Sequence, residues 1–371
     1  MAGDFIPMAV KEIRRETNEV VSILLEYPAS HKDQLHYKPG QYVTVKWTED
    51  GKEHRRSYSI SSVPEDPYLA ITIKEVTGGR ISPFLVRRIK QGDILQILPP
   101  EGRFTAHFGP ENKRNIFLFG AGSGITPLIS IARTVLEKEP RSTVILLYGS
   151  RTAEEIIFKQ QLDQLETRYA GQFHVYHTLS KPEGSGLNVV KALFGKKKSE
   201  WTGMKGRISP GQIEKILEKH PVNKKNDLIF LCGPGDMIEM AEKALIALGM
   251  TEEMIKKEYF TPPSDEADNV RQPSEKKQTG AASKVTVHLR GDKIEIEVTD
   301  KTILDTLLDL GYDAPYSCHS GACATCMAKV VHGEVEMDAC FALSDKEVDN
   351  GYILTCQSHP LTSVVEITYE E

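Results

Sequence analysis

The chain has 371 residues, of which 40% are apolar and 26% are charged, and its formal net charge is -6. This size and composition predict a well-packed protein of two or three domains and give no support to nucleic-acid binding. No segment approaches eighteen consecutive apolar residues, and the first residues lack the basic start and apolar run of a signal peptide, so the sequence predicts a cytoplasmic protein without membrane insertion.

Residues 1–112 are predicted to form a small antiparallel β-barrel. Strands are expected at 43–47, 69–73 and 94–98, separated by turns rich in Gly and Pro. Ser82 and Pro83 are typical of a helix start, with the serine as the cap and the proline at the first helical position.

Residues 113–263 are predicted to form a doubly wound α/β domain around a parallel sheet. Apolar strands alternate with amphipathic helices along this region. The predicted strands lie at 116–119, 144–148, 173–176 and 228–231, one helix is expected after the first strand and another from Ile156 to Leu165, and the sheet should end near Phe260.

Residues 264–283 contain too little apolar surface to pack, so they are predicted to form a flexible linker. Residues 284–371 begin with two alternating strands and a helix from Ile303 to Leu310, which predicts an α+β domain. This last part has 6 Lys/Arg and 16 Asp/Glu, a net charge of -10, which leaves +4 (40 minus 36) for residues 1–283. Such an acidic surface suits a basic partner, although an acidic solvated face without a partner is the alternative.

The C-terminal part also carries the most informative motif of the chain. Cys318, Cys323, Cys326 and Cys356 follow the spacing C-x4-C-x2-C...C that is typical of a plant-type 2Fe-2S cluster. A zinc site and disulfides are the alternatives; zinc usually shows two close pairs of ligands, and disulfides are disfavoured in a reducing compartment. His319 lies between two of these cysteines and is interpreted as a loop residue, because all four thiol ligands are already present.

A glycine-rich turn, Gly120-Ala121-Gly122-Ser123-Gly124, joins a buried strand to a helix and predicts a dinucleotide site. Gly122 and Gly124 would allow close approach of the ligand. At the end of the next strand, Ser150 and Arg151 stand where a classical NAD fold has an acidic residue, which favours the 2'-phosphate of NADPH. A surface arginine, with NADH as the donor, is the alternative.

A third motif, Arg56-Ser57-Tyr58-Ser59, combines a guanidinium for a phosphate, an aromatic ring for stacking and a small donor, as a flavin site requires. Taken in order with Gly79-Arg80-Ile81-Ser82, the glycine-rich turn, Cys232-Gly233-Pro234 and Glu258-Tyr259-Phe260, it resembles the ferredoxin-NADP reductase superfamily. With the cysteine motif placed last, nearly the whole chain resembles the reductase subunits of phenylacetyl-CoA epoxidases, in which an FAD β-barrel, an NAD(P) domain and a ferredoxin-like (β-grasp) domain feed electrons to a diiron oxygenase.

This resemblance implies specific roles for the motif residues. Arg56 would hold the FAD pyrophosphate, Tyr58 would stack on the isoalloxazine, and Ser59 would bond near its reactive nitrogen. Thr126 would lie near flavin and nicotinamide, and Cys232 against the nicotinamide, so these two and Ser59 are the candidate catalytic residues; for Cys232 a buried apolar role is the alternative. The remaining expected cofactor contacts are Ser57, Gly79, Arg80, Ile81, Ser82, Gly122, Gly124, Ser150, Arg151, Gly233, Pro234 and Phe260, with the cluster held by the four cysteines.

The predicted function is therefore electron transfer from NADPH through FAD and the cluster to an external diiron oxygenase. Another acceptor, such as a ring-hydroxylating dioxygenase, an alkane hydroxylase or a hybrid-cluster protein, would require the same motifs. A redox-sensing module without turnover is the alternative from a different class. The sequence leaves the acceptor, the choice between NADPH and NADH, and the oligomeric state open.

Overall fold

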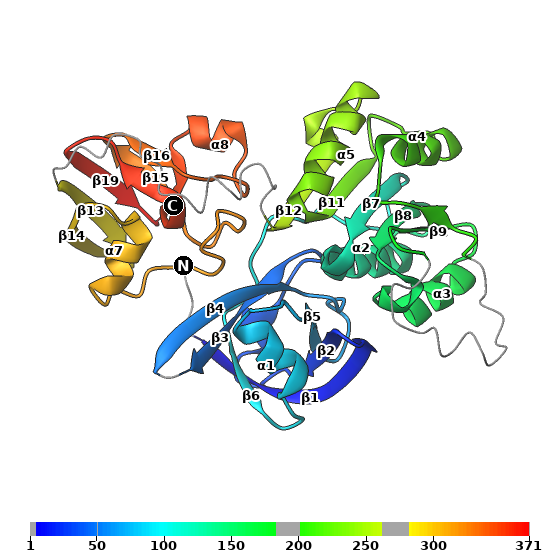
Figure 1. Ribbon diagram of the computed structural model, residues 1–371, viewed down its shortest axis with the longest axis horizontal. Helices are drawn as coiled ribbons and strands as arrows, with labels where there is room; N and C mark the ends of the chain where they lie inside the picture. Colours follow the sequence, from blue (N-terminus) through cyan, green and yellow to red (C-terminus); the bar gives the residue numbers. More distant parts are fainter. Residues whose placement is uncertain (1–4, 50, 183–200, 262–281, 371) are drawn as a thin grey trace.

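The computed structural model describes residues 5–49, 51–182, 201–261 and 282–370, which form three sheets of five or six strands and a small two-stranded one. In Figure 1 the N-terminal barrel lies at the bottom, with the parallel sheet and its helices to one side above it and the C-terminal domain to the other. In these ranges none of the helices has the length and apolarity that crossing a bilayer would require.

The N-terminal sheet has the strand order β4-β3-β6-β1-β2-β5, and all its pairs are antiparallel. A bridge between Ile60 and Ile71 connects the two edges, so the sheet closes into the predicted barrel around an apolar core. The strands are β1 (Ile6–Thr17), β2 (Val20–Leu25), β3 (Tyr42–Glu49), β4 (Lys52–Ser59), β5 (Leu69–Lys74) and β6 (Ile94–Ile97), with the short helix η1 (Lys32–Leu35).

Helix α1 (Ile81–Arg87) begins two residues earlier than the serine-cap prediction, which placed its first helical residue at Pro83. Arg80 occupies the cap position, and its side chain caps no backbone group. The Ser82 hydroxyl instead accepts a hydrogen bond from the Val76 N–H at 3.0 Å, which closes the loop before the helix. The prediction of Ser82 as the cap is therefore wrong, because a loop contact competes for its oxygen.

The second sheet is parallel throughout, with the order β10-β9-β8-β7-β11-β12, as predicted for a doubly wound domain. Helices α2 and α3 pack on one face, and α4 and α5 on the other. The strands are β7 (Asn115–Ala121), β8 (Thr143–Ser150), β9 (Phe173–Leu179), β10 (Met204–Lys205), β11 (Leu228–Pro234) and β12 (Ile255–Thr261). The helices are η2 (Gly122–Gly124), α2 (Ile125–Lys138), η3 (Ala153–Glu155), α3 (Lys159–Arg168), α4 (Pro210–Lys219), α5 (Gly235–Ala247) and η5 (Glu252–Met254).

The helix predicted from Ile156 to Leu165 starts later than expected, at Lys159. Phe158 has a φ of 60°, a left-handed conformation that an α-helix interior does not contain, so the preceding apolar residues pack as an irregular segment. Ile156 and Ile157 are apolar because they are buried in the core, not because they belong to a helix.

The C-terminal sheet has the order β14-β13-β19-β15-β17, with β13 and β19 parallel, and α7 packs against it as in a β-grasp fold. The predicted linker lies outside the described residues except for its last two, and β13 begins at the last of these, Ser283. The strands are β13 (Ser283–Leu289), β14 (Asp292–Val298), β15 (Met327–His332), β16 (Val335–Met337), β17 (Tyr352–Leu354), β18 (Ser358–Pro360) and β19 (Val364–Thr368), with helices α7 (Ile303–Asp309), α8 (Asp345–Asp349) and η6 (Thr355–Gln357). The Thr302 hydroxyl caps α7 by accepting from the Asp305 N–H at 3.1 Å.

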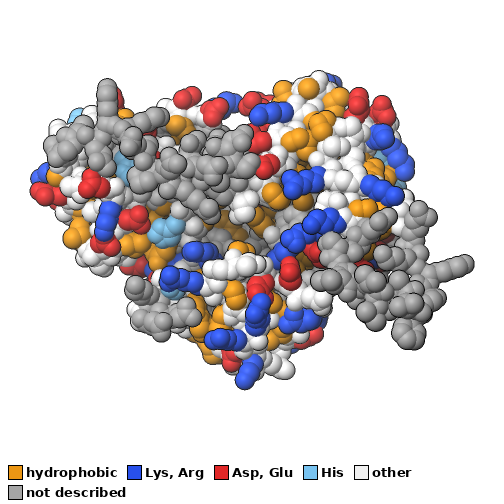
Figure 2. All heavy atoms as spheres, in the orientation of Figure 1, with side chains coloured by type: hydrophobic (Ala, Val, Ile, Leu, Met, Phe, Trp, Pro, Cys, Tyr) orange, Lys and Arg blue, Asp and Glu red, His pale blue; other side chains and the backbone are white. Residues whose placement is uncertain are grey.

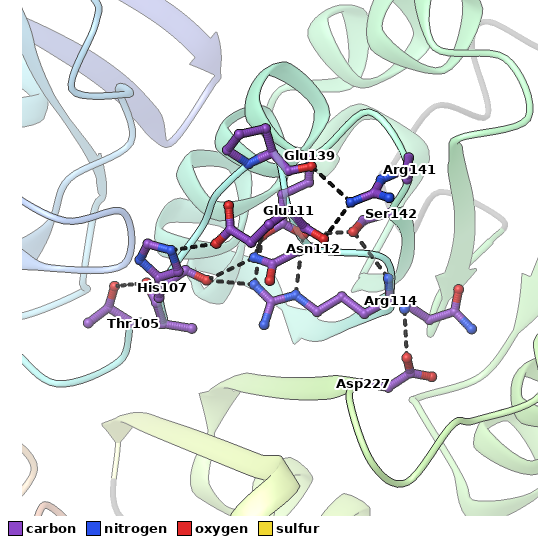
Figure 3. Close-up of polar contacts among 12 residues, drawn as sticks. Thr105, His107, Glu111, Asn112, Arg114, Glu139, Arg141, Ser142 and Asp227 are labelled. Carbon is purple, nitrogen blue, oxygen red and sulfur yellow. Dashed lines mark hydrogen bonds and ion pairs between the residues drawn. The ribbon is translucent and has the colours of Figure 1, made fainter.

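A buried carboxylate anchors the segment between the barrel and the parallel sheet (Figure 3). Glu139, fully buried after α2, accepts hydrogen bonds from Arg114 at 2.7 Å, from Asn112 at 2.6 Å and from the Ser142 hydroxyl at 2.7 Å. Because a buried charge without partners is costly, this network fixes the path by which the chain enters β7.

Candidate flavin, nucleotide and iron-sulfur sites

A cavity of about 640 Å³ lies where the three domains meet. Its walls come from β4, from the loop before α1, from the first turn of α2, from β12 and from the cysteine-bearing loop of the C-terminal domain. Many of the Lys and Arg side chains on the face drawn in Figure 2 lie over the barrel and the parallel-sheet domain. The cavity brings together segments that are far apart in the sequence.

The predicted flavin residues gather at this cavity. Arg56, Ser57, Tyr58 and Ser59 line one wall, and Gly79, Arg80, Ile81 and Ser82 line another. The Arg56 guanidinium is held by the Arg55 carbonyl, which accepts from its Nη1 at 2.7 Å, and Arg80 Nη1 lies 3.5 Å from His54 Nε2. Two cations suited to a pyrophosphate and a half-buried tyrosine ring thus share one cavity, so the side chains present fit FAD.

Glu258 is the main cavity residue that was missing from the predicted site. Its carboxyl lies in the cavity and accepts a hydrogen bond from the Ser59 hydroxyl at 3.3 Å. Burial raises the pKa of Glu258 to about 8, with the Ser59 hydrogen bond acting in the opposite direction. In the sequence, Glu258-Tyr259-Phe260 contributes only to the family resemblance. This motif is the signal from which Glu258 could have been predicted as a site residue. Phe260 also lines the cavity, as expected.

The glycine-rich turn and the end of β11 form one compact unit beside the cavity. A Cβ on Gly124 would stand 2.1 Å from the Cys232 carbonyl oxygen, so this glycine is required by the packing of the turn on β11. Gly122 has a φ of 55° and open space around it, which suits a ligand's approach. Thr126, buried at the start of α2, lines the cavity and donates to the Ser123 carbonyl at 3.0 Å.

Cys232 is fully buried next to this turn, and burial raises the pKa of its thiol. Gly233 and Pro234 follow at the end of β11 and lead directly into α5. None of these three residues lines the 640 Å³ cavity itself. They lie at the carboxyl end of a parallel strand, which is where doubly wound folds bind nucleotides.

Ser150 and Arg151 lie at the end of β8 and not at the cavity. The Ser150 side chain is nearly buried, whereas the Arg151 side chain is 59% exposed and its Nε lies 4.0 Å from Glu155 Oε2. The exposed guanidinium is therefore available to a ligand on the nucleotide side of the molecule, with an acidic neighbour close by.

The four motif cysteines converge at the inner edge of the C-terminal domain. Cys326 and Cys356 belong to the apolar core, whereas Cys318 and Cys323 line the cavity. Hydrogen bonds with Cys323, Cys356 and Ser320 hold the pKa of the Cys318 thiol well below its usual range. In the described ranges, no group of three His, Cys, Asp or Glu side chains is arranged to hold a single metal ion.

His319 and Gly321 shape the loop between these cysteines. His319 has a φ of 55°, and its Nδ1 lies 3.6 Å from Asp305 Oδ1, pointing to a carboxylate outside the cysteine set. Gly321 has a φ of 68°, and a Cβ there would stand 2.7 Å from the Ala339 carbonyl oxygen. The small residues of the motif are thus needed for the tight path of the loop.

Comparisons with known proteins agree with this architecture. Residues 7–106 match the oxidoreductase FAD-binding domain family, residues 118–243 the oxidoreductase NAD-binding domain family, and residues 287–361 the 2Fe-2S iron-sulfur cluster binding domain family. These matches confirm FAD, a nicotinamide dinucleotide and a 2Fe-2S cluster as the cofactors, and they exclude the zinc alternative.

Curated relatives cover the whole chain. The sequence is 31% identical to a subunit of the 1,2-phenylacetyl-CoA epoxidase of Escherichia coli (strain K12), over 99% of this chain and 98% of that protein. It is equally 31% identical to the ferredoxin reductase component of 3-ketosteroid-9-alpha-monooxygenase of Rhodococcus rhodochrous, over 98% and 96% of the two chains.

Solved structures share the fold. The CS-b5R domains of human Ncb5or superpose with a TM-score of 0.57 at 25% identity, covering 68% of this chain and 69% of that one. An intact type IV self-sufficient cytochrome P450 monooxygenase superposes with a TM-score of 0.66 at 18% identity and covers 98% of this chain and 41% of the other. The second match extends the likeness of fold to all three domains.

Proposed function

The chain belongs to the ferredoxin-NADP reductase superfamily, in the group that carries a C-terminal 2Fe-2S ferredoxin domain, and we propose that it passes electrons from NADPH to a separate diiron oxygenase. One observation carries the proposal: a single cavity is lined by the flavin motif, by the first turn of α2 and by two of the cluster cysteines. A nicotinamide and the 2Fe-2S cluster could therefore both contact a flavin that fills the cavity.

The chemistry requires three cofactors because a nicotinamide gives up two electrons together as a hydride, a 2Fe-2S cluster takes them singly, and flavin can do both. The protein's task is binding and orientation. Arg56 and Arg80 would hold the phosphates of FAD and Tyr58 would stack on its flavin ring, while Ser59 and Glu258 provide a hydrogen-bonded pair at the cavity wall. In the flavin-free cavity burial raises the pKa of Glu258 to about 8, so near neutral pH this pair can hold a proton.

On the nucleotide side, Gly122 and the end of β11 at Cys232 would receive the dinucleotide, and Arg151 would bind the 2'-phosphate of NADPH. The nearby Glu155 carboxylate would repel that phosphate, so the preference for NADPH over NADH depends on Arg151 outweighing it. A cytoplasmic location suits the free thiols of Cys232 and Cys340.

The acceptor is proposed to be a diiron oxygenase of the phenylacetyl-CoA epoxidase kind, on the basis of the full-length likeness to a subunit of that enzyme. The steroid monooxygenase reductase is equally similar, and a glycine betaine monooxygenase reductase subunit of Pseudomonas aeruginosa (strain UCBPP-PA14) is 31% identical over 89% of this chain. The oxygenase of another monooxygenase system is therefore the second candidate acceptor.

Anaerobic reduction of the holoprotein with NADPH tests the internal chain. Flavin bleaching should be accompanied by the spectroscopic signal of a reduced cluster; bleaching alone would contradict the proposal. Purification of the tagged protein from native cells grown on phenylacetate then tests the acceptor. Co-purification of diiron oxygenase subunits supports the epoxidase, whereas a different oxygenase would keep the electron chain and change the pathway.

A further inference from the structure

The ferredoxin domain is attached to the barrel through a buried arginine. The Arg55 side chain is only 7% exposed, and its guanidinium lies 4.4 Å from the ring centroid of Tyr316 in the ferredoxin domain. Its Nη2 donates to Asp313 Oδ1 at 2.7 Å, across the domain boundary, while its Nε donates to Glu53 Oε1 at 2.6 Å within the barrel. Arg55 is thus a barrel residue whose charge is shared with the ferredoxin domain.

A second arginine makes a similar contact at another point of the interface. Arg103, which follows the barrel, pairs with Glu347 of helix α8, and its Nη2 lies 3.0 Å from the Met327 sulfur. Both attachments therefore have the cation on the flavin side and the carboxylate on the ferredoxin side. This polarity matches the charges of the two parts, +4 for residues 1–283 and -10 for residues 284–371.

Besides the two ion pairs, two hydroxyl contacts place the cluster loop against the flavin cavity. The Ser57 hydroxyl lies 2.7 Å from that of Ser317, which precedes the ligand Cys318. The Tyr42 hydroxyl lies 2.8 Å from that of Thr325, which precedes Cys326. The loop that holds the cluster is thus positioned from both of its ends.

The docked barrel covers the side of the ferredoxin domain through which electrons can leave the cluster. Cys326 and Cys356 are packed in the ferredoxin core, and the loop side of Cys318 and Cys323 faces the flavin cavity. Because electron transfer between proteins requires close approach, an external acceptor needs the same loop side that the barrel occupies in this structure.

We propose that the electron acceptor binds to the face of the ferredoxin domain that carries Asp313 and Glu347, using basic side chains that take the places of Arg55 and Arg103. The barrel and the acceptor then compete for one acidic surface. This inference rests on the proposed function, because it assumes that the cluster serves an external protein. Exchange of one ion pair for a similar one changes the free energy little, so the ferredoxin domain can leave the barrel when an acceptor offers the same charges.

Competition makes a prediction that simple electrostatic attraction does not. If only the undocked form binds the acceptor, the apparent Kd equals the intrinsic Kd divided by the undocked fraction. Removing a cation from the barrel raises that fraction and should tighten acceptor binding. Removing a carboxylate from the ferredoxin domain also releases it, but deletes an acceptor contact and should weaken binding.

The experiment uses the oxidised holoprotein and ferricytochrome c, a basic one-electron acceptor protein, with binding measured by calorimetry at low ionic strength. We expect Arg55→Gln and Arg103→Gln to lower the Kd about threefold to tenfold, and Asp313→Asn and Glu347→Gln to raise it by a similar factor. Arg14→Gln and Glu295→Gln are matched controls, since they remove the same charges from exposed pairs with Glu12 and Lys284 and should change the Kd less than twofold.

Small-angle scattering provides a second readout that does not depend on turnover. All four interface variants should increase the radius of gyration, whereas the control variants Arg14→Gln and Glu295→Gln should keep the compact value. Unchanged Kd values in the ferredoxin-side variants, or weaker binding in the barrel-side variants, would overturn the shared surface. Failure of NADPH to reduce the wild-type cofactors would instead contradict the proposed function and leave these binding results intact.

Discussion

The cluster loop and the flavin cavity are both redox sites, but they are built in opposite ways. Three of the four cluster ligands lie within nine residues, Cys318 to Cys326, and the fourth joins them from the core of the same domain. The flavin cavity draws its walls from β4, α1, α2, β12 and the cluster loop, and so from all three domains. A local site should tolerate changes elsewhere in the molecule, whereas an assembled one should depend on how the domains meet.

The largest expected effect separates the two sites directly. Cys326→Ser removes a buried thiolate ligand and should abolish the 2Fe-2S cluster, because a serine oxygen is a poor replacement for a soft ligand. Bound FAD should be unchanged. Iron content and visible absorption check this, with Cys340→Ser, a half-buried cysteine outside the motif, as the control that should keep both cofactors.

The second prediction concerns the anchor between the barrel and the parallel sheet (Figure 3). Arg114→Met leaves the buried Glu139 carboxylate without its cationic partner and should lower the free energy of unfolding by about 3 to 5 kcal/mol. FAD affinity should fall with it, while the cluster spectrum stays intact. Arg141→Met is the matched control, because Arg141 bonds backbone carbonyls of Pro110 and Glu111 in the same cluster and its loss should cost about 1 kcal/mol. Similar denaturation midpoints for the two variants would contradict the anchor.

A third prediction uses the half-buried Glu258 carboxyl in the wall of the assembled cavity. The pKa of Glu258 is about 8 in the folded flavin-free protein and near its ordinary value of 4.5 when unfolded. At pH values between these two pKa values, the folded state binds a proton that the unfolded state has lost. Glu258 therefore stabilises the fold at low pH, and this contribution is lost as the pH rises toward 8. The free energy of unfolding should fall by at most about 1.4 kcal/mol per pH unit. Urea unfolding at pH 6 and pH 8 should show this slope in the wild type and a weaker one in Glu258→Gln. An unchanged slope would mean that Glu258 does not titrate there.

Fourth, Arg56→Ala should weaken FAD binding about 10-fold to 100-fold, because a charge-assisted phosphate contact contributes about 1.5 to 3 kcal/mol. Equilibrium titration of the flavin-free protein with FAD measures the change. Arg14→Ala, which removes an exposed barrel arginine paired with Glu12 outside the cavity lining, should bind FAD as the wild type does. Equal losses in both variants would indicate a general charge effect instead of a specific phosphate contact.

The smallest effect is expected at the nucleotide end. Arg151→Ala should raise the KM for NADPH about tenfold, equivalent to about 1.4 kcal/mol, and leave the KM for NADH nearly unchanged. Ferricyanide reduction with each donor checks this, and Arg168→Ala at the exposed end of α3 serves as the control. If the KM for NADH rises by the same factor, Arg151 does not bind the 2'-phosphate.

The sequence predicted the fold class and the cofactors because each depends on short patterns. The cysteine spacing, the glycine-rich turn and the β4 motif describe backbone shapes within a few residues, and the family matches confirm the cofactors that they indicated. Errors occurred where a longer contact decided the outcome. Ser82 bonds to the Val76 N–H instead of capping α1, and the apolar pair Ile156-Ile157 fills the core without being helical.

Tertiary structure alone decided three features of the site. Glu258 is in the sequence an ordinary acidic residue of an edge strand, and only desolvation in the cavity raises its pKa, against the opposing effect of the Ser59 hydrogen bond. Arg55 and Arg56 are adjacent and chemically identical, yet the alternation of β4 helps to bury the first against the ferredoxin domain while the second is exposed and lines the flavin cavity. The cluster loop meets that cavity because the ferredoxin domain is placed on the barrel. Local patterns determine which chemistry a segment can perform, whereas burial and contact between domains depend on packing between residues hundreds of positions apart, which no short pattern contains.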